Sequence, residues 1–227
     1  ENEIVSITGL IGSGKTALAS QIFGLNPDPK VTMTLNGNSY SPQSPEHAIS
    51  AGVFMCPKDR ASNAVVSEFD ISNNLALPFF KRHSRLSFIR NKSLTQNARN
   101  SINELGIVCQ SEMDSVTTLS GGNQQKVMVG RWLAEDSSVL LLDEPFQGVD
   151  IKARRDIGHQ IRSTSRKRAT IIFVAELDEA LEISDRVIVL HEGNLVGDYQ
   201  NKSKNIPKIV SSFSGSANNL DSANYGT

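Results

Sequence analysis

A glycine-rich segment between a strand-like run and a helix-like run constrains the fold of this 227-residue chain more than any other feature. The run Glu3–Thr8 is short and rich in β-branched residues, and Gly9 closes it, as expected for a buried strand that ends in a turn. Residues 15–23, KTALASQIF, have helical spacing and stop before Gly24 and Pro27. The segment therefore predicts a strand, a tight loop and a helix in immediate succession.

Strand-like and helix-like runs continue to alternate along the chain. We expect strands at 31–35, 52–56, 138–143 and 169–175 and two more around Glu192-Gly193, and helices at 45–51, 151–165 and 176–182. Asn36-Gly37 after the first of these strands predicts a hairpin. Apolar strands alternating with helices predict an α/β fold with a mostly parallel core sheet covered on both faces.

One mostly helical stretch, from about residue 70 to 115, interrupts this alternation. We therefore expect a domain over residues 1–210 with an inserted helical subdomain at about 70–130. Residues 211–227 are rich in Ser, Asn, Ala and Gly and predict a flexible tail. Trp132 stands at helical spacing and is expected in a core.

The composition excludes several classes of function. The formal net charge of −1 lacks the excess of cations on which nucleic-acid binding rests. The two cysteines, Cys56 and Cys109, form no paired motif, which favours a reducing compartment and indicates no cysteine metal site. No apolar run in the sequence is long enough to cross a bilayer.

Residues 9–16, GLIGSGKT, fit the phosphate-loop pattern G-x-x-x-x-G-K-[ST], in the strand–loop–helix context that the pattern requires. Glycines let backbone N–H groups turn toward phosphate oxygens, and the helix N-terminus adds partial positive charge. Lys15 is expected to reach the β- and γ-phosphates, and the Thr16 hydroxyl to bind Mg²⁺. The predicted nucleotide-binding residues of this segment are Gly9, Leu10, Ile11, Gly12, Ser13, Gly14, Lys15, Thr16 and Ala17.

The run VLLLDEP, residues 139–145, predicts a buried strand with two carboxylates at its carboxyl end, where ligands bind in open α/β sheets. We expect Asp143 to hold Mg²⁺, mainly through its water shell, and Glu144 to polarise the attacking water. Alone, the pair would better be interpreted as a helix cap. A phosphate loop in the same chain favours the catalytic interpretation.

A third motif, LSGGNQQKV at residues 119–127, places a serine and two glycines ahead of an apolar-periodic segment. This arrangement predicts a helix whose N-terminus binds an anion. The phosphate loop, LSGGNQQ and LLLDEP in this order resemble the ATP-binding cassette of ABC transporters, from Glu3 to about Tyr199.

The resemblance implies the cofactors ATP and Mg²⁺ and a particular use of the third motif. In that family, two cassettes pack head to tail and sandwich two ATP molecules. The motif of one cassette closes over the ATP held by the phosphate loop of the other. Nucleotide binding is accordingly implied for Ser120, Gly121, Gly122, Gln124 and, at the D-loop position, Asp150.

The residues of these motifs resemble those of one branch of the family, the importers of ribose, galactose and xylose. There two cassettes are fused in one chain, and GVFMCPKDR (52–60) and DEPFQGVDIKAR resemble the VPEDR and DEPTRGIDVGAK stretches of the C-terminal one. The resemblance implies ATP hydrolysis coupled to sugar import, with a second cassette, permease subunits and, indirectly, a periplasmic substrate-binding protein as partners. It also implies a peripheral location on the cytoplasmic face of the bacterial inner membrane. The missing starting Met indicates a chain cut from a longer protein, with a truncated N-terminal β-subdomain that would carry the adenine-stacking aromatic residue.

Two positions depart from the family pattern. The switch histidine that contacts the γ-phosphate would fall at Ala175, and the glutamine that senses the γ-phosphate and faces the membrane subunit would fall at Lys58. C-terminal sugar cassettes commonly lack both residues, so the departures agree with that branch. Because alanine offers no donor to the reacting phosphate, we expect weakened hydrolysis at this cassette's own site.

Several alternatives stay open at this point. The cargo could be a nucleoside, an inositol or an autoinducer, since these importers share the cassette style. The cassette could be purely allosteric, which Ala175 favours and Glu144 opposes, or could act outside transport, in translation or DNA repair. A basic cluster is either a solvated helical face or a contact for the membrane subunit; its members are Lys81, Arg82, Arg85, Arg90 and Lys92.

Overall fold

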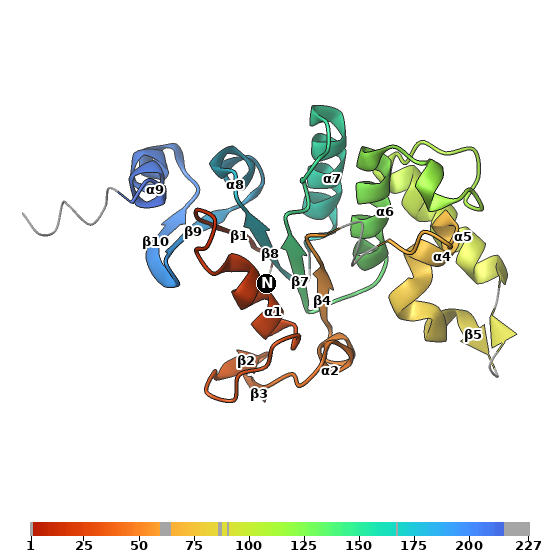
Figure 1. The fold of residues 1–227 in the computed structure, drawn as a ribbon, viewed down its shortest axis with the longest axis horizontal. Helices are drawn as coiled ribbons and strands as arrows, with labels where there is room; N and C mark the ends of the chain where they lie inside the picture. Colours follow the sequence, from red (N-terminus) through yellow and green to blue (C-terminus); the bar gives the residue numbers. More distant parts are fainter. Residues whose placement is uncertain (1, 60–64, 86–87, 90, 167, 216–227) are drawn as a thin grey trace, which may run out of the picture. The chain divides into compact units, whose positions relative to one another are not determined.

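The computed structural model describes residues 2–59, 65–85, 88–89, 91–166 and 168–215 (Figure 1). The chain divides into two compact units. The first unit comprises Glu1–Met55, Ser137–Glu144 and Ser165–Thr227, and the second comprises Cys56–Asp136 and Pro145–Thr164.

Within the described residues, six strands of the first unit form one sheet in the order β10-β9-β1-β8-β7-β4. Their bounds are β1 Ile4–Thr8, β4 Val53–Cys56, β7 Val139–Asp143, β8 Ala169–Val174, β9 Arg186–His191 and β10 Asn194–Gln200. β1 pairs in parallel with β8 and β9, β7 pairs in parallel with β8, and β10 runs antiparallel to β9. β7 is an apolar run up to Asp143, whereas the central strands also carry buried hydroxyl side chains, Ser6 and Thr8 on β1 and Thr170 on β8. Both faces of such a sheet are covered. The α/β fold with a mostly parallel sheet is confirmed.

Helices and a hairpin complete the first unit. Their bounds are α1 Lys15–Ile22, β2 Met33–Leu35, β3 Asn38–Tyr40, α2 Pro45–Ser50, α8 Leu177–Ile183, η3 Ser203–Asn205 and α9 Ile206–Phe213. α1 packs against β7 and β8, α8 against β1 and β8, and α9 against β9 and β10. Both turns that the sequence predicts are present, and the backbone has positive φ at 36–37 and again at 192–193.

α9 differs from the expected boundary. It continues to Phe213 because Ile209 is buried, so the first three residues of the expected tail, 211–213, are helical. The rest of that tail, from residue 216 onward, lies outside the described residues.

The second unit includes the range 70–130 of the expected helical subdomain, together with residues 56–69, 131–136 and 145–164. Its elements are α4 Ile71–Ala76, η1 Leu77–His83, β5 Ser84–Arg85, β6 Phe88–Ile89, α5 Asn91–Leu105, η2 Val116–Thr118, α6 Gly121–Leu133 and α7 Ile151–Thr164. The β5–β6 pair was not expected inside a helical stretch. Apolar side chains from α4, α5 and α6 form a core, among them Leu75, Leu105 and Val127. Trp132 is buried as expected and meets the Phe79 ring edge to face, with centroids 5.8 Å apart.

A buried polar contact ties α6 to α4. Arg131 donates through Nε to the Asn74 carbonyl (2.6 Å) and through Nη2 to Asn74 Oδ1 (3.3 Å). Asn74 in turn donates through Nδ2 to the carbonyls of Val66, Phe69 and Asp70. Burial lowers the pKa of Arg131 to about 10, and the guanidinium still carries its proton at neutral pH. These hydrogen bonds provide partners for polar groups that would otherwise be buried without one between the apolar helices.

Lys81 and Lys92 of the basic cluster are exposed. The side chains of Arg82 and Arg85, and Arg90 altogether, lie outside the described part of the chain. Both interpretations of the cluster require such exposure, and the choice between them stays a prediction.

Candidate functional site

The loop between β1 and α1 has a backbone that only glycine accommodates at its first position. A Cβ on Gly9 would lie 2.2 Å from the carbonyl oxygen of Leu190, closer than any real contact. Gly12 and Gly14 have φ of 86° and 96°, in the region that side chains disfavour. Glycine-rich turns at the start of a helix are typical of anion-binding loops, in which backbone N–H groups can turn toward a ligand.

The β9–β10 hairpin supports this loop. Gly193 donates its N–H to the Ser13 carbonyl (3.1 Å), and Ser13 donates its own N–H to the Leu10 carbonyl (3.1 Å). The turn at 192–193 was expected from the sequence, but its contact with the loop was not. Nothing in the local pattern could reveal it, since the two segments are about 180 residues apart.

Lys15 directs its ammonium group into the loop. The side chain is 8% exposed, and Nζ donates to the Gly9 carbonyl (2.5 Å) and more weakly to the Leu10 carbonyl and Ser13 Oγ (both 3.4 Å). A lysine ammonium beside a glycine-rich loop at the start of a helix is suited to binding an anion. The remaining predicted residues of the loop are exposed: Leu10, Ile11, Gly12, Thr16 and Ala17.

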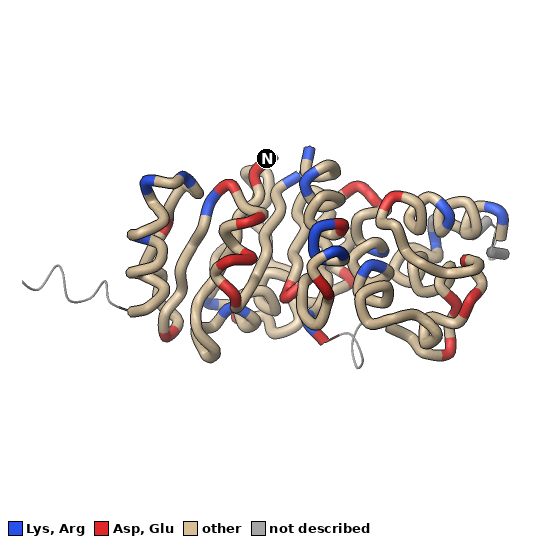
Figure 2. The backbone as a smooth tube through the Cα atoms, turned by 90° about the horizontal axis from the view of Figure 1, so that it is seen from above, with Lys and Arg blue, Asp and Glu red and all other residues tan. Residues whose placement is uncertain are grey.

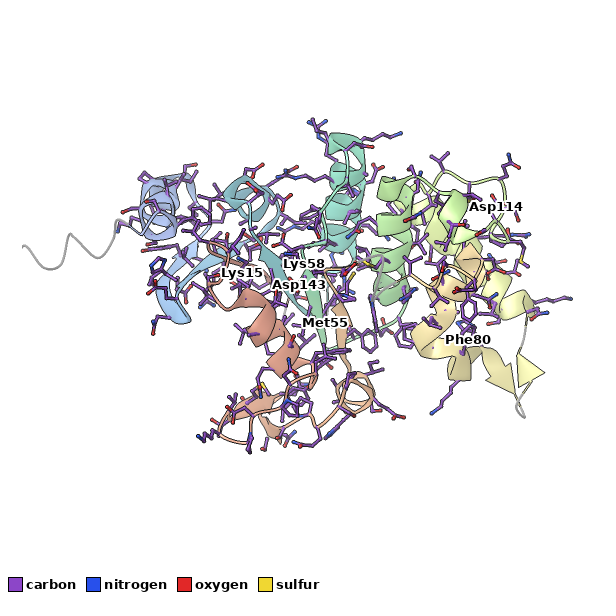
Figure 3. The ribbon with its side chains drawn as sticks, in the orientation of Figure 1. Lys15, Met55, Lys58, Phe80, Asp114 and Asp143 are labelled. Carbon is purple, nitrogen blue, oxygen red and sulfur yellow. The ribbon has the colours of Figure 1, made fainter. Side chains whose placement is uncertain are left out.

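Asp143 lies at the same edge of the sheet as the loop. Its partner in the β7–β8 register is Phe173, and Val174 on β8 pairs with Thr8, the last residue of β1. The carboxyl ends of β1, β8 and β7 therefore stand side by side, and Figure 3 labels Lys15 and Asp143 at two of these ends. Asp143 is 2% exposed, so its carboxylate is held within the protein at this edge.

Glu144 is held at two points by the end of β8. Its N–H donates to the Phe173 carbonyl (2.8 Å), and its Oε2 accepts a hydrogen bond from the N–H of Ala175 (3.2 Å). The residue is 8% exposed and has φ of 50°, in the left-handed region that non-glycine residues rarely occupy. Ala175, the residue at the position of the switch histidine, thus contacts Glu144 through its main-chain N–H.

These residues fit a nucleotide with Mg²⁺. The loop supplies inward N–H groups and one buried cation, which suit a chain of phosphates. Mg²⁺ prefers hard oxygens and is usually held by one or two carboxylates together with substrate phosphates and water. The Asp143 carboxylate and the Thr16 hydroxyl are donors of that type. Within the described residues, no three side chains of His, Cys, Asp or Glu gather in a way that could hold a metal by themselves.

In the second unit, the third motif forms the start of α6. Ser120 is the N-cap, and its Oγ accepts from the N–H and the Nδ2 of Asn123 (3.4 and 3.0 Å). Asn123 Oδ1 accepts from the N–H of Val108 (3.0 Å), and Gln124 Nε2 donates to the Leu119 carbonyl (3.1 Å). The helix start that the sequence predicts at Ser120 is confirmed.

The start of α6 lies beside the start of α7. Asp150 caps α7 by accepting at Oδ1 from the N–H of Ala153 (2.8 Å). A Cβ on Gly122 would lie 3.2 Å from Ala153 Cβ and 3.9 Å from Asp150 Oδ2. Gly121 and Gly122 are half-buried, and Ser120 and Asp150 are exposed. The structure therefore brings together four of the residues predicted from the motif and the D-loop.

Two further residues of this motif, which the sequence pattern did not identify, anchor α6. Lys126 Nζ donates to the Gly106 carbonyl (3.0 Å) and pairs with Asp156 Oδ2 on α7 (2.6 Å), and its side chain is 5% exposed. Gln125, 1% exposed, donates through Nε2 to the Pro145 carbonyl (2.9 Å). Helical periodicity in the sequence assigns polar residues such as Gln125 and Lys126 to the solvent side of a helix. In the structure both side chains are buried.

Lys58 is exposed on the segment that follows β4, where Figure 3 labels it. No helix in the described part of the chain has the length and apolar character needed to cross a membrane.

Comparisons with solved structures agree with this architecture. A nucleotide-free ATP-binding cassette from an ABC transporter superimposes with a TM-score of 0.78 at 19% identity, over 92% of this chain and 85% of that one. A dimeric ATP-binding cassette bound to ADP and Pi in a post-hydrolysis state gives a TM-score of 0.75 at 19% identity, over 89% of this chain and 87% of that one. At this identity the likeness establishes the fold.

Sequence comparisons establish the family. The ribose import ATP-binding protein RbsA 2 of Rubrobacter xylanophilus is 35% identical over 94% of this chain and 41% of its own length. The xylose import ATP-binding protein XylG of Thermoanaerobacter pseudethanolicus is 36% identical over 92% of this chain and 42% of its own length. The chain thus spans about two fifths of the length of these relatives. Residues 1–147 also match the sequence model of the family described as "ABC transporter". With this match and the fold of an ATP-binding cassette, the chain belongs to the ABC transporter family.

Proposed function

We propose that this chain is the energy-coupling cassette of an importer for monosaccharides, and that it binds and hydrolyses MgATP. The observation that carries the proposal is the meeting of the glycine loop, Lys15, Asp143 and Glu144 at one edge of the sheet. The cargo class rests on relatives named as ribose, xylose and arabinose import ATP-binding proteins, at 33–37% identity. Its partners are a second cassette fused in the same parent chain, permease subunits and, through them, a periplasmic binding protein. The cassette lies peripherally on the cytoplasmic face of the bacterial inner membrane.

The roles of the residues follow from their positions. The loop N–H groups and the Lys15 ammonium donate to the phosphate oxygens, while Thr16 and Asp143 hold Mg²⁺. When bound, ATP provides the phosphoanhydride bond that is hydrolysed, and Mg²⁺ neutralises part of the phosphate charge. The Glu144 carboxylate would accept the proton of the water that attacks the bound nucleotide. The other loop residues that would bind the nucleotide are exposed and therefore accessible to it; they are Leu10, Ile11, Gly12 and Ala17.

The experiment that tests this function is reconstitution. The protein that contains this chain, assembled with its permease in vesicles, should release phosphate faster when a sugar-loaded binding protein is added. Ribose, xylose, arabinose and galactose should be compared with a nucleoside and an inositol as cargo. Stimulation by a nucleoside or an inositol alone would keep the transport role and replace the cargo class.

A function in translation or DNA repair is a second candidate, and one observation weighs against it. In the described part of the chain, lysine and arginine positions are interspersed with acidic ones rather than gathered in one stripe (Figure 2). Binding to nucleic acid rests on a concentrated basic surface. We therefore propose a partner set without nucleic acid.

The start of α6 serves the nucleotide of a partner cassette in this proposal. The partial positive charge at the start of a helix favours an anion there, and Gly121 and Gly122 place no side chain in front of it. The side chains of Ser120 and Gln124, with Asp150 of the D-loop, complete the contacts to that nucleotide. The proposal is supported by two apolar side chains that are exposed beside the motif in the second unit, Val108 (70%) and Ile151 (72%). Such side chains are typical of a surface that another chain covers.

This pairing gives a testable expectation at Ile151. Ile151→Asp should weaken ATP-dependent association of cassettes about tenfold, because a carboxylate replaces an apolar contact at the interface. Sedimentation velocity with MgATP and the Glu144→Gln change, which traps ATP, measures the association. Val210→Asp is the control, since Val210 is also exposed (46%) but lies on α9. Equal weakening by both changes would contradict the proposed interface.

We further propose that hydrolysis at this chain's own site is weak. Ala175 offers no side-chain donor to the γ-phosphate, and Lys58 replaces a glutamine of the family pattern. Removing a charge-assisted hydrogen bond from a reacting phosphate costs on the order of 3 kcal/mol, or roughly a hundredfold in rate.

The asymmetry is tested with matched glutamate changes in the full tandem protein. Glu144→Gln should reduce steady-state phosphate release much less than the same change in the other cassette, which carries most of the turnover. Ala175→His should raise turnover at this site if the histidine is the missing part. Equal losses from the two glutamate changes would show that the cassettes are equivalent.

A further inference from the structure

We propose that the main-chain N–H of Ala175 is the positioning donor for the Glu144 carboxylate, so that the end of β8 aims the base in a cassette without the switch histidine. The proposal rests on the proposed role of Glu144 in hydrolysis. It assigns a role to the backbone of residue 175, where the family pattern assigns one to a side chain.

The first support is the double anchoring of Glu144. Its N–H donates to Phe173 O at 2.8 Å, which extends the β7–β8 ladder one residue beyond the Asp143–Phe173 pair. Its Oε2 then accepts from the N–H of Ala175 at 3.2 Å. The backbone and the side chain of Glu144 are thus both held at the end of β8, by Phe173 and by Ala175, two residues further along.

The second support is the position of Ala175 in the chain. β8 ends at Val174, and Glu176 is the N-cap of α8, so Ala175 lies between the strand and the helix. Its N–H lies past the last residue of the β1–β8 register, the Thr8–Val174 pair. A donor at this place is available to the nearest acceptor, and that acceptor is the carboxylate.

The third support is burial. Glu144 is 8% exposed, and a carboxylate with so little access to water requires donors from the protein. The positive φ of Glu144 (50°) carries a conformational cost, which the surrounding contacts must offset. A fixed N–H that restricts the carboxylate to one orientation has the geometry of a positioning group for a general base.

The hydrogen bond itself can be tested in the nucleotide-free chain. Amide hydrogen exchange of Ala175 should become roughly tenfold faster in Glu144→Ala than in the unmodified chain, because its acceptor is gone. Glu144→Gln keeps an oxygen acceptor and should preserve most of the protection. The amide of Val174 serves as the internal control. Unchanged exchange at Ala175 in Glu144→Ala would overturn the proposal.

The effect on turnover is tested in the full tandem protein, with the glutamate of the other cassette changed to Gln so that only this site reacts. Two variants remove the N–H of residue 175: Ala175→Pro, and an ester in which lactic acid takes the place of Ala175. Both should lower the single-turnover rate roughly tenfold to a hundredfold and leave ATP affinity within about twofold. Ala175→Gly keeps the N–H and adds no side-chain donor, so its rate should fall much less than the rate of either of these variants.

Two outcomes overturn the proposal in distinguishable ways. If the ester variant reacts at the full rate while Glu144→Gln is inactive, the Ala175 N–H has no positioning role. The role of Glu144 in hydrolysis then stands. An unchanged rate in Glu144→Gln itself removes the hydrolytic role, and the positioning role with it. Loss of ATP affinity in the ester variant to the same extent as rate would indicate a structural defect and would also count against the proposal.

Discussion

Lys15→Ala should lower the affinity of this chain for ATP by roughly a hundredfold or more. The ammonium group is buried inside the glycine loop, within hydrogen-bonding distance of the Gly9 and Leu10 carbonyls, and in our proposal it binds the phosphates. A hydrogen bond to a charged partner contributes about 1.5–3 kcal/mol, and contacts to two phosphates would together account for about 3 kcal/mol or more. Each 1.4 kcal/mol corresponds to about a tenfold change in the dissociation constant. Equilibrium binding of MgATP measures the loss.

The control for this change is Lys30→Ala, because Lys30 is an exposed lysine of the same unit, outside the loop. Its affinity for ATP should equal that of the unmodified chain. The free energy of unfolding of both variants shows whether the loop stays folded, since Lys15→Ala removes a donor from two loop carbonyls. Unchanged ATP affinity in a folded Lys15→Ala variant would exclude the phosphate-loop assignment.

Much of the fold could be predicted from the sequence because its signals are local. The β1 strand, the loop and α1 follow from a β-branched run, closely spaced glycines and helical spacing within twenty residues. Asn36-Gly37 determined a hairpin, and Ser120 determined the start of α6. The residue types at these positions limit the backbone to few conformations, so the local sequence alone predicts these elements.

The contacts that hold the site together could not be predicted in this way. Gly193 supports Ser13 from a hairpin near the other end of the domain, and Lys126 meets Asp156 across 30 residues. Such pairs depend on the order of strands in the sheet and on which helix faces touch, and a single sequence encodes neither in a local pattern. The same limit applies to Ala175. Its departure from the family pattern was visible in the sequence, whereas the hydrogen bond from its backbone to Glu144 was not.

The limit also changes how a test of the third motif must be designed. In sequence terms, Gly122 is simply a small residue at a helix start, and an aspartate there would add a negative charge. In the structure, any side chain at this position also crowds Ala153, because its Cβ would lie 3.2 Å from that methyl group. The added carboxylate would moreover approach Asp150, whose Oδ2 is 3.9 Å from the same Cβ. A loss of function in Gly122→Asp alone would therefore mix charge with crowding.

Gly122→Asn separates the two effects, because asparagine has nearly the shape of aspartate and no charge. In the full tandem protein, Gly122→Asp should reduce phosphate release at the site completed by this motif about a hundredfold or more, since a carboxylate would face the γ-phosphate of the partner's ATP. Gly122→Asn should retain clearly more turnover. Affinity of this chain's own loop for ATP should stay within about twofold in both variants, because the proposal assigns Gly122 to the nucleotide of the partner cassette. An equal loss of turnover in both would attribute the effect to shape, and a comparable loss of own-site affinity would show that the motif serves the nucleotide on Lys15 rather than the one held by a partner.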